Sequence, residues 1–211
     1  FYHMGVLMQV ELFFPSAVAR DNFPEFLPAA RETIVEYLAK TPANNWNVCQ
    51  SAPMFDSRLD DLLALIAQAS YEILVEQGFD MTHNQTAVRE FWAQEFTRNG
   101  QHQEHVHNRG AQITGFYFVE VPENSSHPVI FDPRPSKRQI NLPAADSSTV
   151  SYASEQILFQ INPGDLILFN SWLGHGFTRH ASDQPFRFIH FNVMVEEHVN
   201  PEQSQIQVEI V

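Results

Sequence analysis

Three histidines of this chain have a spacing that could bind a divalent metal ion. His105 and His107 are separated by one residue, and His175 follows much later, at the end of the segment 171–175. If residues 105–107 are extended, both imidazoles point to the same face, because strand side chains alternate between faces. A third imidazole from a distant strand would complete three adjacent metal positions and leave others open for substrate, water or dioxygen.

Neighbouring residues keep the choice of ligands open. His102 and Glu104 form a second pair with the same strand spacing, and they would supply the carboxylate of the usual two-histidine-one-carboxylate site. A histidine pair in a chain with 10 histidines is also compatible with ordinary strand residues. His3, His83, His127, His180 and His198 have no partner pattern, and we expect them at the surface.

Arg187 is the fourth residue whose surroundings suggest chemistry. It lies in the strongly apolar segment 186–195, where a buried guanidinium is costly without an anion. It could clamp a carboxylate through two parallel hydrogen bonds, or it could pair with an acidic side chain of the protein. Arg187 follows His175 by twelve residues, so a short hairpin would bring both to one pocket. The opposite strand parity of His190 and Asn192 then predicts that they lie outside this pocket or in a second layer of residues around it.

The elements that position these residues follow from hydrophobic periodicity. The pattern predicts one helix over 23–39, with Pro24 in its first turn, and a second over 58–76, capped by Ser57. From about residue 89, short apolar runs alternate with turn residues, as in an antiparallel sandwich or barrel. Strands are expected near 4–14, 90–97, 101–107, 112–121, 128–131, 138–141, 156–161, 165–170, 174–179 and 186–195, and loops over 43–56, 122–127 and 142–155.

This order of elements predicts an α+β fold that is mainly β, with helices first and a sandwich after them. The length of 211 residues suits a single domain, 1–211. We divide it into a mostly helical part, 1–88, a jelly-roll catalytic core, 89–196, and a C-terminal tail, 197–211.

Composition and charge exclude several classes of partner. The net charge is −13, with 12 Lys and Arg against 25 Asp and Glu, which disfavours nucleic acid and anionic membranes. No apolar run reaches the length of a membrane span, and residues 1–14 do not resemble a signal peptide. The single cysteine, Cys49, cannot form an intrachain disulfide, which favours a cytoplasmic location.

Several spaced blocks resemble the 2-oxoglutarate/Fe(II) oxygenases of bacteria and phages that carry an H-x-H…H…R pattern. The resemblance covers about residues 90–195, and the blocks together are far more specific than any one alone. They are residues 91–94, 99–101, 105–107, 114–119, 121–122, 131–134, 163–169, 171–175 and 187–192.

The resemblance implies a double-stranded β-helix, a cupin-like jelly roll with the N-terminal helices packed outside. It implies Fe(II) bound by His105, His107 and His175, and the cosubstrate 2-oxoglutarate bound by Arg187, with a hydrogen bond from Tyr117. The reaction would be oxidative decarboxylation of 2-oxoglutarate to succinate and CO₂, coupled to hydroxylation of an unidentified small molecule or protein side chain.

One departure from the family pattern supports an alternative function. His107 occupies the position of the usual carboxylate ligand, so the centre would be less anionic and its redox cycle would differ. The alternative is a cupin-like metal protein, an enzyme or a sensor, that uses three histidines without 2-oxoglutarate.

Overall fold

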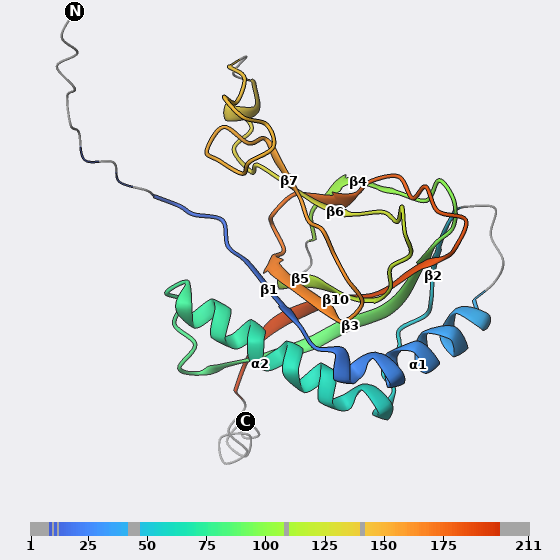
Figure 1. The fold of residues 1–211 in the computed structure, drawn as a ribbon. Helices are drawn as coiled ribbons and strands as arrows, with labels where there is room; N and C mark the ends of the chain where they lie inside the picture. Colours follow the sequence, from blue (N-terminus) through green and yellow to red (C-terminus); the bar gives the residue numbers. More distant parts are fainter. Residues whose placement is uncertain are drawn as a thin grey trace, which may run out of the picture.

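The computed structural model describes residues 9, 11, 13–41, 47–107, 110–139 and 142–198. Two antiparallel sheets face each other, and two helices lie outside the larger sheet (Figure 1). The larger sheet has the order β1 (Val18–Asn22), β8 (Asp165–Asn170), β5 (Ala111–Glu120), β10 (Phe186–Glu197), β3 (Asn84–Phe96) and β2 (Val48–Gln50). The smaller sheet has the order β4 (His102–His105), β9 (His175–Phe177), β6 (Pro128–Phe131) and β7 (Gln156–Leu158).

The two helices cover the outer face of the larger sheet. They are α1 (Leu27–Ala39) and α2 (Asp60–Glu76), and each buries an apolar stripe, for example Ile34 on α1 and Leu62 on α2. Against these stripes the sheet presents one set of alternating side chains, which includes Phe91, Tyr117, Ile189 and Phe191. The helix-side face of β10 therefore carries its odd-numbered residues.

A second, aromatic layer lies between the two sheets. Its buried members include Phe96, Phe116, Phe118, Phe169, Phe177, Phe186 and Phe188. Their rings touch across the gap, and the centroids of Phe116 on β5 and Phe177 on β9 are 4.9 Å apart. This inner face of β10 carries the even-numbered residues, so the strand is buried on both sides.

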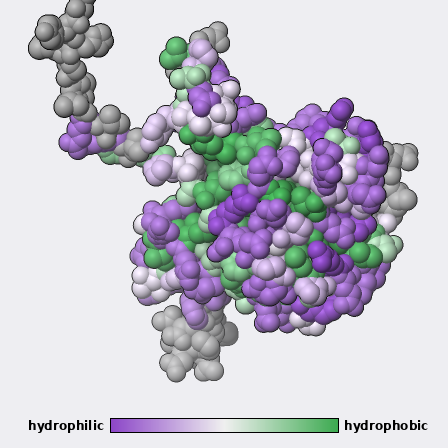
Figure 2. All heavy atoms as spheres, viewed as in Figure 1, coloured by the Kyte–Doolittle hydropathy of each residue, from purple (hydrophilic) through white to green (hydrophobic). Residues whose placement is uncertain are grey.

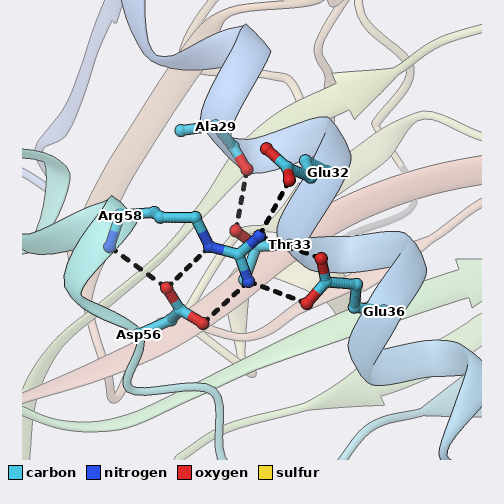
Figure 3. Close-up of polar contacts among 6 residues, drawn as sticks. All are labelled: Ala29, Glu32, Thr33, Glu36, Asp56 and Arg58. Carbon is cyan, nitrogen blue, oxygen red and sulfur yellow. Dashed lines mark hydrogen bonds and ion pairs between the residues drawn. The ribbon is translucent and has the colours of Figure 1, made fainter.

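Arg58 links α1 to the segment that leads into α2 (Figure 3). Its guanidinium pairs with Glu32 at 3.2 Å and Glu36 at 2.8 Å on the exposed side of α1. The carboxylate of Asp56 accepts hydrogen bonds from the backbone N–H and from the guanidinium of Arg58. These bonds lower the pKa of the Asp56 carboxyl to about 2. Asp56 is thus the capping residue of the short helix Ser57–Leu59 that precedes α2, and the predicted cap, Ser57, is wrong by one position.

Most predicted elements are confirmed with shifted ends, and a few are wrong. Strand β3 begins at residue 84 instead of 90, and the predicted loop 43–56 contains strand β2. The described residues of the predicted strand 138–141 form a single helical turn, Lys137–Gln139. The predicted strand 4–14 lies largely outside the described residues, and the first strand of the described chain is Val18–Asn22.

The surface is polar over most of the face seen in Figure 2, with apolar residues gathered across the middle of that face. Trp172, at the turn between β8 and β9, is a large apolar side chain that is 51% exposed. In the part of the chain that the structure describes, neither helix is long and apolar enough to cross a membrane.

Candidate metal centre

The structure brings His105, His107 and His175 together between the two sheets. One ring nitrogen of each lies within 4.8 Å of those of the other two. The ring centroids of His105 and His175 are 4.4 Å apart, and those of His107 and His175 are 5.1 Å apart. Among the described residues, this is the group of ligand-type side chains whose geometry suits a metal ion.

Hydrogen bonds orient two of these imidazoles. The Nδ1 atom of His105 lies 2.8 Å from the carbonyl oxygen of Gln103, and that of His175 lies 2.9 Å from the carbonyl oxygen of Leu173. Such bonds place the proton on Nδ1 and leave Nε2 free to bind a metal. The Nε2 atoms of His107 and His175 are buried without a hydrogen-bond partner, as expected for atoms that await a ligand.

Pairing of β4 with β9 sets the distance between the histidines. His105 is the direct register partner of His175. His107 lies just beyond the end of β4, where its backbone N–H donates to the carbonyl oxygen of Ser171 at 2.9 Å. This bond, and not a continuous strand over 105–107, turns the second imidazole toward the centre.

Gly176 permits the close approach of these two strands. A Cβ atom at this position would lie 2.7 Å from the carbonyl oxygen of His102 and 3.1 Å from backbone atoms of Gln103. Both neighbours are backbone, so neither can turn away.

We therefore expect Gly176→Ala to separate β4 from β9. Overpacking of this kind costs about 1–3 kcal/mol of unfolding free energy. Chemical denaturation should report this loss, and calorimetry should report weaker Fe(II) binding, because His105 and His175 lie on the two strands that move apart. Unchanged metal affinity in a destabilised variant would show that the strand spacing does not set the site. Gly78, whose added Cβ would meet no atom within 4 Å but whose backbone φ is +89°, is a control for strain without overpacking.

Burial keeps His107 and His175 neutral. Desolvation, together with the charges of nearby histidines, lowers the pKa of His175 to about 3 and that of His107 to about 4. The same cause lowers the pKa of His102 to about 4 and that of His190 well below its usual value. Neutral imidazole is the form that binds a metal, so the centre is ready to bind at pH 7.

These shifts predict that the metal-free protein loses stability in mild acid. Below a pH of about 6.5 the unfolded histidines bind protons that the folded ones refuse, so the unfolding free energy falls as pH falls. Each such group contributes about 1.4 kcal/mol per pH unit until the pH reaches its folded pKa, near 4 for His107. Thermal unfolding followed between pH 7 and 4 should show this decline in the metal-free protein. A flat profile over that range would contradict the burial of neutral histidines.

The alternative ligands proposed from the sequence do not join the group. His102 is half-buried against Phe96, with its Nε2 atom 3.1 Å from the Nε2 atom of Gln94. Glu104 instead forms two hydrogen bonds with Arg138, at 2.7 and 2.9 Å. Neither side chain is among those whose ligand atoms converge with His105.

Arg187 and Tyr117 do not lie beside the three histidines. Arg187 lies on the outer face of the larger sheet, where it donates to Glu95 at 2.6 Å and to Glu120 at 2.9 Å. Tyr117 packs in the helix-side core, and its hydroxyl donates to the carbonyl oxygen of Phe23 at 2.7 Å. We predicted that Arg187 lies on the inner face of its strand, and this prediction is wrong. Phe188, and not Arg187, lies on the face that carries the histidines.

His190 and Asn192, which we expected outside the pocket or in a second layer of residues around it, face inward, and His190 lies in such a layer, against His107. The ring centroid of His190 is 4.9 Å from that of His107, and Asn192 is 2% exposed. One of the five histidines that we expected at the surface is not there. His180 is fully buried and hydrogen-bonds to Ser126 and Gln184. The sequence of β10 does distinguish its two faces, with His190 and Asn192 on one and Arg187 on the other, but we took Arg187 as the marker of the inner face.

The donor set fits a metal ion but provides no cation for a carboxylate ligand. Three imidazoles suit Fe(II) and other first-row divalent ions. Among the described residues, no arginine or lysine is buried. Phe116 and Phe169 border His175, with ring centroids 5.9 and 4.9 Å from it. Among the described residues, no fully buried cation therefore lies beside the three histidines to pair with the distal carboxylate of 2-oxoglutarate.

Comparison with solved structures shows which fold this is. A prolyl-4-hydroxylase from Pseudomonas putida superposes with a TM-score of 0.57 at 12% identity, covering 85% of this chain and 92% of that one. HygX from Streptomyces hygroscopicus, solved with nickel and 2-oxoglutarate, gives 0.58 at 13%, covering 85% and 83%. A viral collagen prolyl hydroxylase from Paramecium Bursaria Chlorella virus-1 gives 0.52 at 9%, covering 83% and 94%. At these identities the likeness concerns the fold, which is the double-stranded β-helix expected from the sequence.

The sequence itself matches the model of the "Putative 2OG-Fe(II) oxygenase" family over residues 90–192. A search of the curated proteins found no match. The matched region contains the three histidines and strands of both sheets. Residues 90–192 thus match a domain of the Fe(II)- and 2-oxoglutarate-dependent oxygenase family, as the spaced sequence blocks indicated, and the family's cofactor and cosubstrate are Fe(II) and 2-oxoglutarate.

Proposed function

We propose that this protein is an Fe(II)-dependent oxygenase whose iron is bound by His105, His107 and His175. The observation that carries this proposal is the convergence of three imidazoles, two of them with buried, unpartnered Nε2 atoms. Bound iron would supply dioxygen activation, and with the family's cosubstrate it would support hydroxylation of a substrate C–H bond. The carbonyl oxygens of Gln103 and Leu173 fix the tautomer of two ligands, and the surrounding phenylalanine rings exclude water.

A second candidate is a three-histidine metal enzyme or sensor that does not use 2-oxoglutarate. One observation favours it, namely that Arg187 pairs with Glu95 and Glu120 on the outer face while the inner face is lined by aromatic rings. The two candidates share the metal and differ in whether the protein also binds 2-oxoglutarate.

Calorimetric titration without oxygen separates the two. The protein is first titrated with Fe(II) or Mn(II), and the loaded protein is then titrated with 2-oxoglutarate. Saturable, metal-dependent binding of 2-oxoglutarate supports the oxygenase of the family type. Metal binding without 2-oxoglutarate binding supports the second candidate, and absence of metal binding removes both.

The substrate and the cellular setting are parts of the same proposal. We expect a small molecule or a protein side chain, since the names of the similar solved structures refer to hydroxylation of proline and to a complex with hygromycin B. A cytoplasmic location is supported by the single cysteine, and the charge of −13 disfavours nucleic acid.

A further inference from the structure

Beside the three histidines lies a group of polar side chains that their role as ligands does not explain. It consists of Glu90, Trp92, His190 and Asn192, which we call the inner polar cluster. All four lie on the inner face of β3 and β10, where Trp92 is the register partner of His190 and Glu90 is that of Asn192. The rings of Trp92 and His190 are 4.3 Å apart, and His190 in turn touches His107. The cluster is thus continuous with the metal centre.

Three of its members have a buried polar atom without a partner. These atoms are Nε1 of Trp92, Nδ1 of His190 and Oδ1 of Asn192. His190 and Asn192 are 3% and 2% exposed, so bulk water does not satisfy them. Folded proteins rarely leave such atoms unpaired, and several of them in one place indicate a missing ligand.

The hydrogen-bond network defines which of these atoms accept. The hydroxyl of Thr114 donates to the carbonyl oxygen of Phe191 at 3.0 Å, so its oxygen is left to accept from Nε2–H of His190 at 3.3 Å. The neutral ring of His190 then carries no proton on Nδ1, which is an acceptor. The side-chain amide of Asn192 donates to the carboxylate of Glu90, which leaves Oδ1 of Asn192 as a second acceptor.

The cluster therefore offers one donor, the indole N–H of Trp92, and two acceptors, next to a carboxylate. Glu90 is exposed, so the cluster opens to solvent on this side. A ligand that complements it brings N–H or O–H groups and is neutral or positively charged. An anionic group would face two lone pairs and the carboxylate, and the low dielectric between the sheets would make that repulsion strong.

We infer that the inner polar cluster is the substrate subsite of this enzyme, and that it takes a neutral or cationic group rich in hydrogen-bond donors, such as an amide, an amine or a guanidine. The inference rests on the proposed function, because the metal centre makes this the place where a substrate is oxidised. The subsite lies beside His107, so a donor group bound there would hold the rest of the substrate at the metal.

The indole N–H signal of Trp92 in nitrogen-15 NMR spectra tests this inference. Zinc-loaded protein is titrated with acetamide, guanidinium at millimolar concentration, and methanesulfonate, which are small probes that coordinate zinc poorly. The signal is assigned by its loss in Trp92→Phe, and the signal lost in Trp172→Phe gives an exposed reference. We expect saturable shifts of the Trp92 signal with acetamide and guanidinium, and none with methanesulfonate.

Matched variants and a separate measurement of zinc binding make the outcome decisive. Asn192→Ala should weaken the response to both donor probes at least tenfold, whereas Asn84→Ala, at the far end of the same strand pair, should leave it unchanged. An equal shift with methanesulfonate, or no saturable shift with either donor probe, overturns the inference and leaves water as the occupant. Zinc binding is measured separately by calorimetry, so failure of the metal centre and failure of the subsite are distinguishable.

Discussion

His175→Ala should abolish tight metal binding and, with it, all iron-dependent activity. His175 is fully buried, and its unpartnered Nε2 atom is directed to the point where the other two imidazoles meet. Loss of a residue that only supports a ligand costs 10–100-fold in metal affinity, so loss of the ligand itself should cost at least about 100-fold. Calorimetry with Fe(II) or Mn(II) under anaerobic conditions measures this change directly.

The controls for this variant must distinguish the loss of a metal ligand from unfolding of the protein. His83→Ala removes an exposed histidine at the start of the sheet and should leave metal affinity unchanged. Circular dichroism and denaturation of metal-free His175→Ala show whether the sandwich persists, since a cavity beside Phe116 and Phe169 will cost some stability. A folded His175→Ala protein that binds Fe(II) as tightly as the parent would rule out the three-histidine centre.

The metal centre could be anticipated from sequence because its signal is spacing. The pair His105 and His107, and the later His175, belong to blocks whose order alone indicates the family. The strands around them also alternate clearly enough to be located, and β5 was predicted within one residue at each end. The spacing of the histidines in the sequence does not predict the backbone hydrogen bonds that hold them near one another. An example is the bond from the N–H of His107 to the carbonyl oxygen of Ser171.

The orientation of β10 could not be anticipated from apolar alternation, for a physical reason. Alternation reveals the inner face only where one face is polar, and in this strand both faces are buried, one under the helices and one under the smaller sheet. Phe188 and Phe191 are equally apolar, so the choice depended on whether Arg187 or the pair His190 and Asn192 marks the inner face. We placed Arg187 inside because a cation in an apolar strand needs an anionic partner, which could be a bound carboxylate. In the structure its partners are Glu95 and Glu120.

Arg187→Ala should therefore destabilise the protein without changing what the metal centre binds. The guanidinium bridges β3, β10 and β5 through Glu95 and Glu120, and its side chain is 23% exposed. Breaking an exposed ion pair costs up to about 1 kcal/mol of unfolding free energy, and breaking a fully buried one costs about 3–5 kcal/mol. A partly buried pair should cost an intermediate amount. We expect a loss of about 1–2 kcal/mol in unfolding free energy, because two carboxylates are left facing each other without their cation.

Arg89→Ala provides a matched control, because Arg89 pairs with Glu196 between the same two strands, β3 and β10, but is 56% exposed. That variant should lose less than about 1 kcal/mol. Replacing Glu95 and Glu120 by glutamine in the Arg187→Ala background should restore part of the stability, because the loss stems from unpaired charge. Affinities for Fe(II) and for 2-oxoglutarate should equal those of the parent. If Arg187→Ala instead keeps full stability and loses a 2-oxoglutarate affinity that the parent has, Arg187 acts as the clamp that its place in the sequence first suggested.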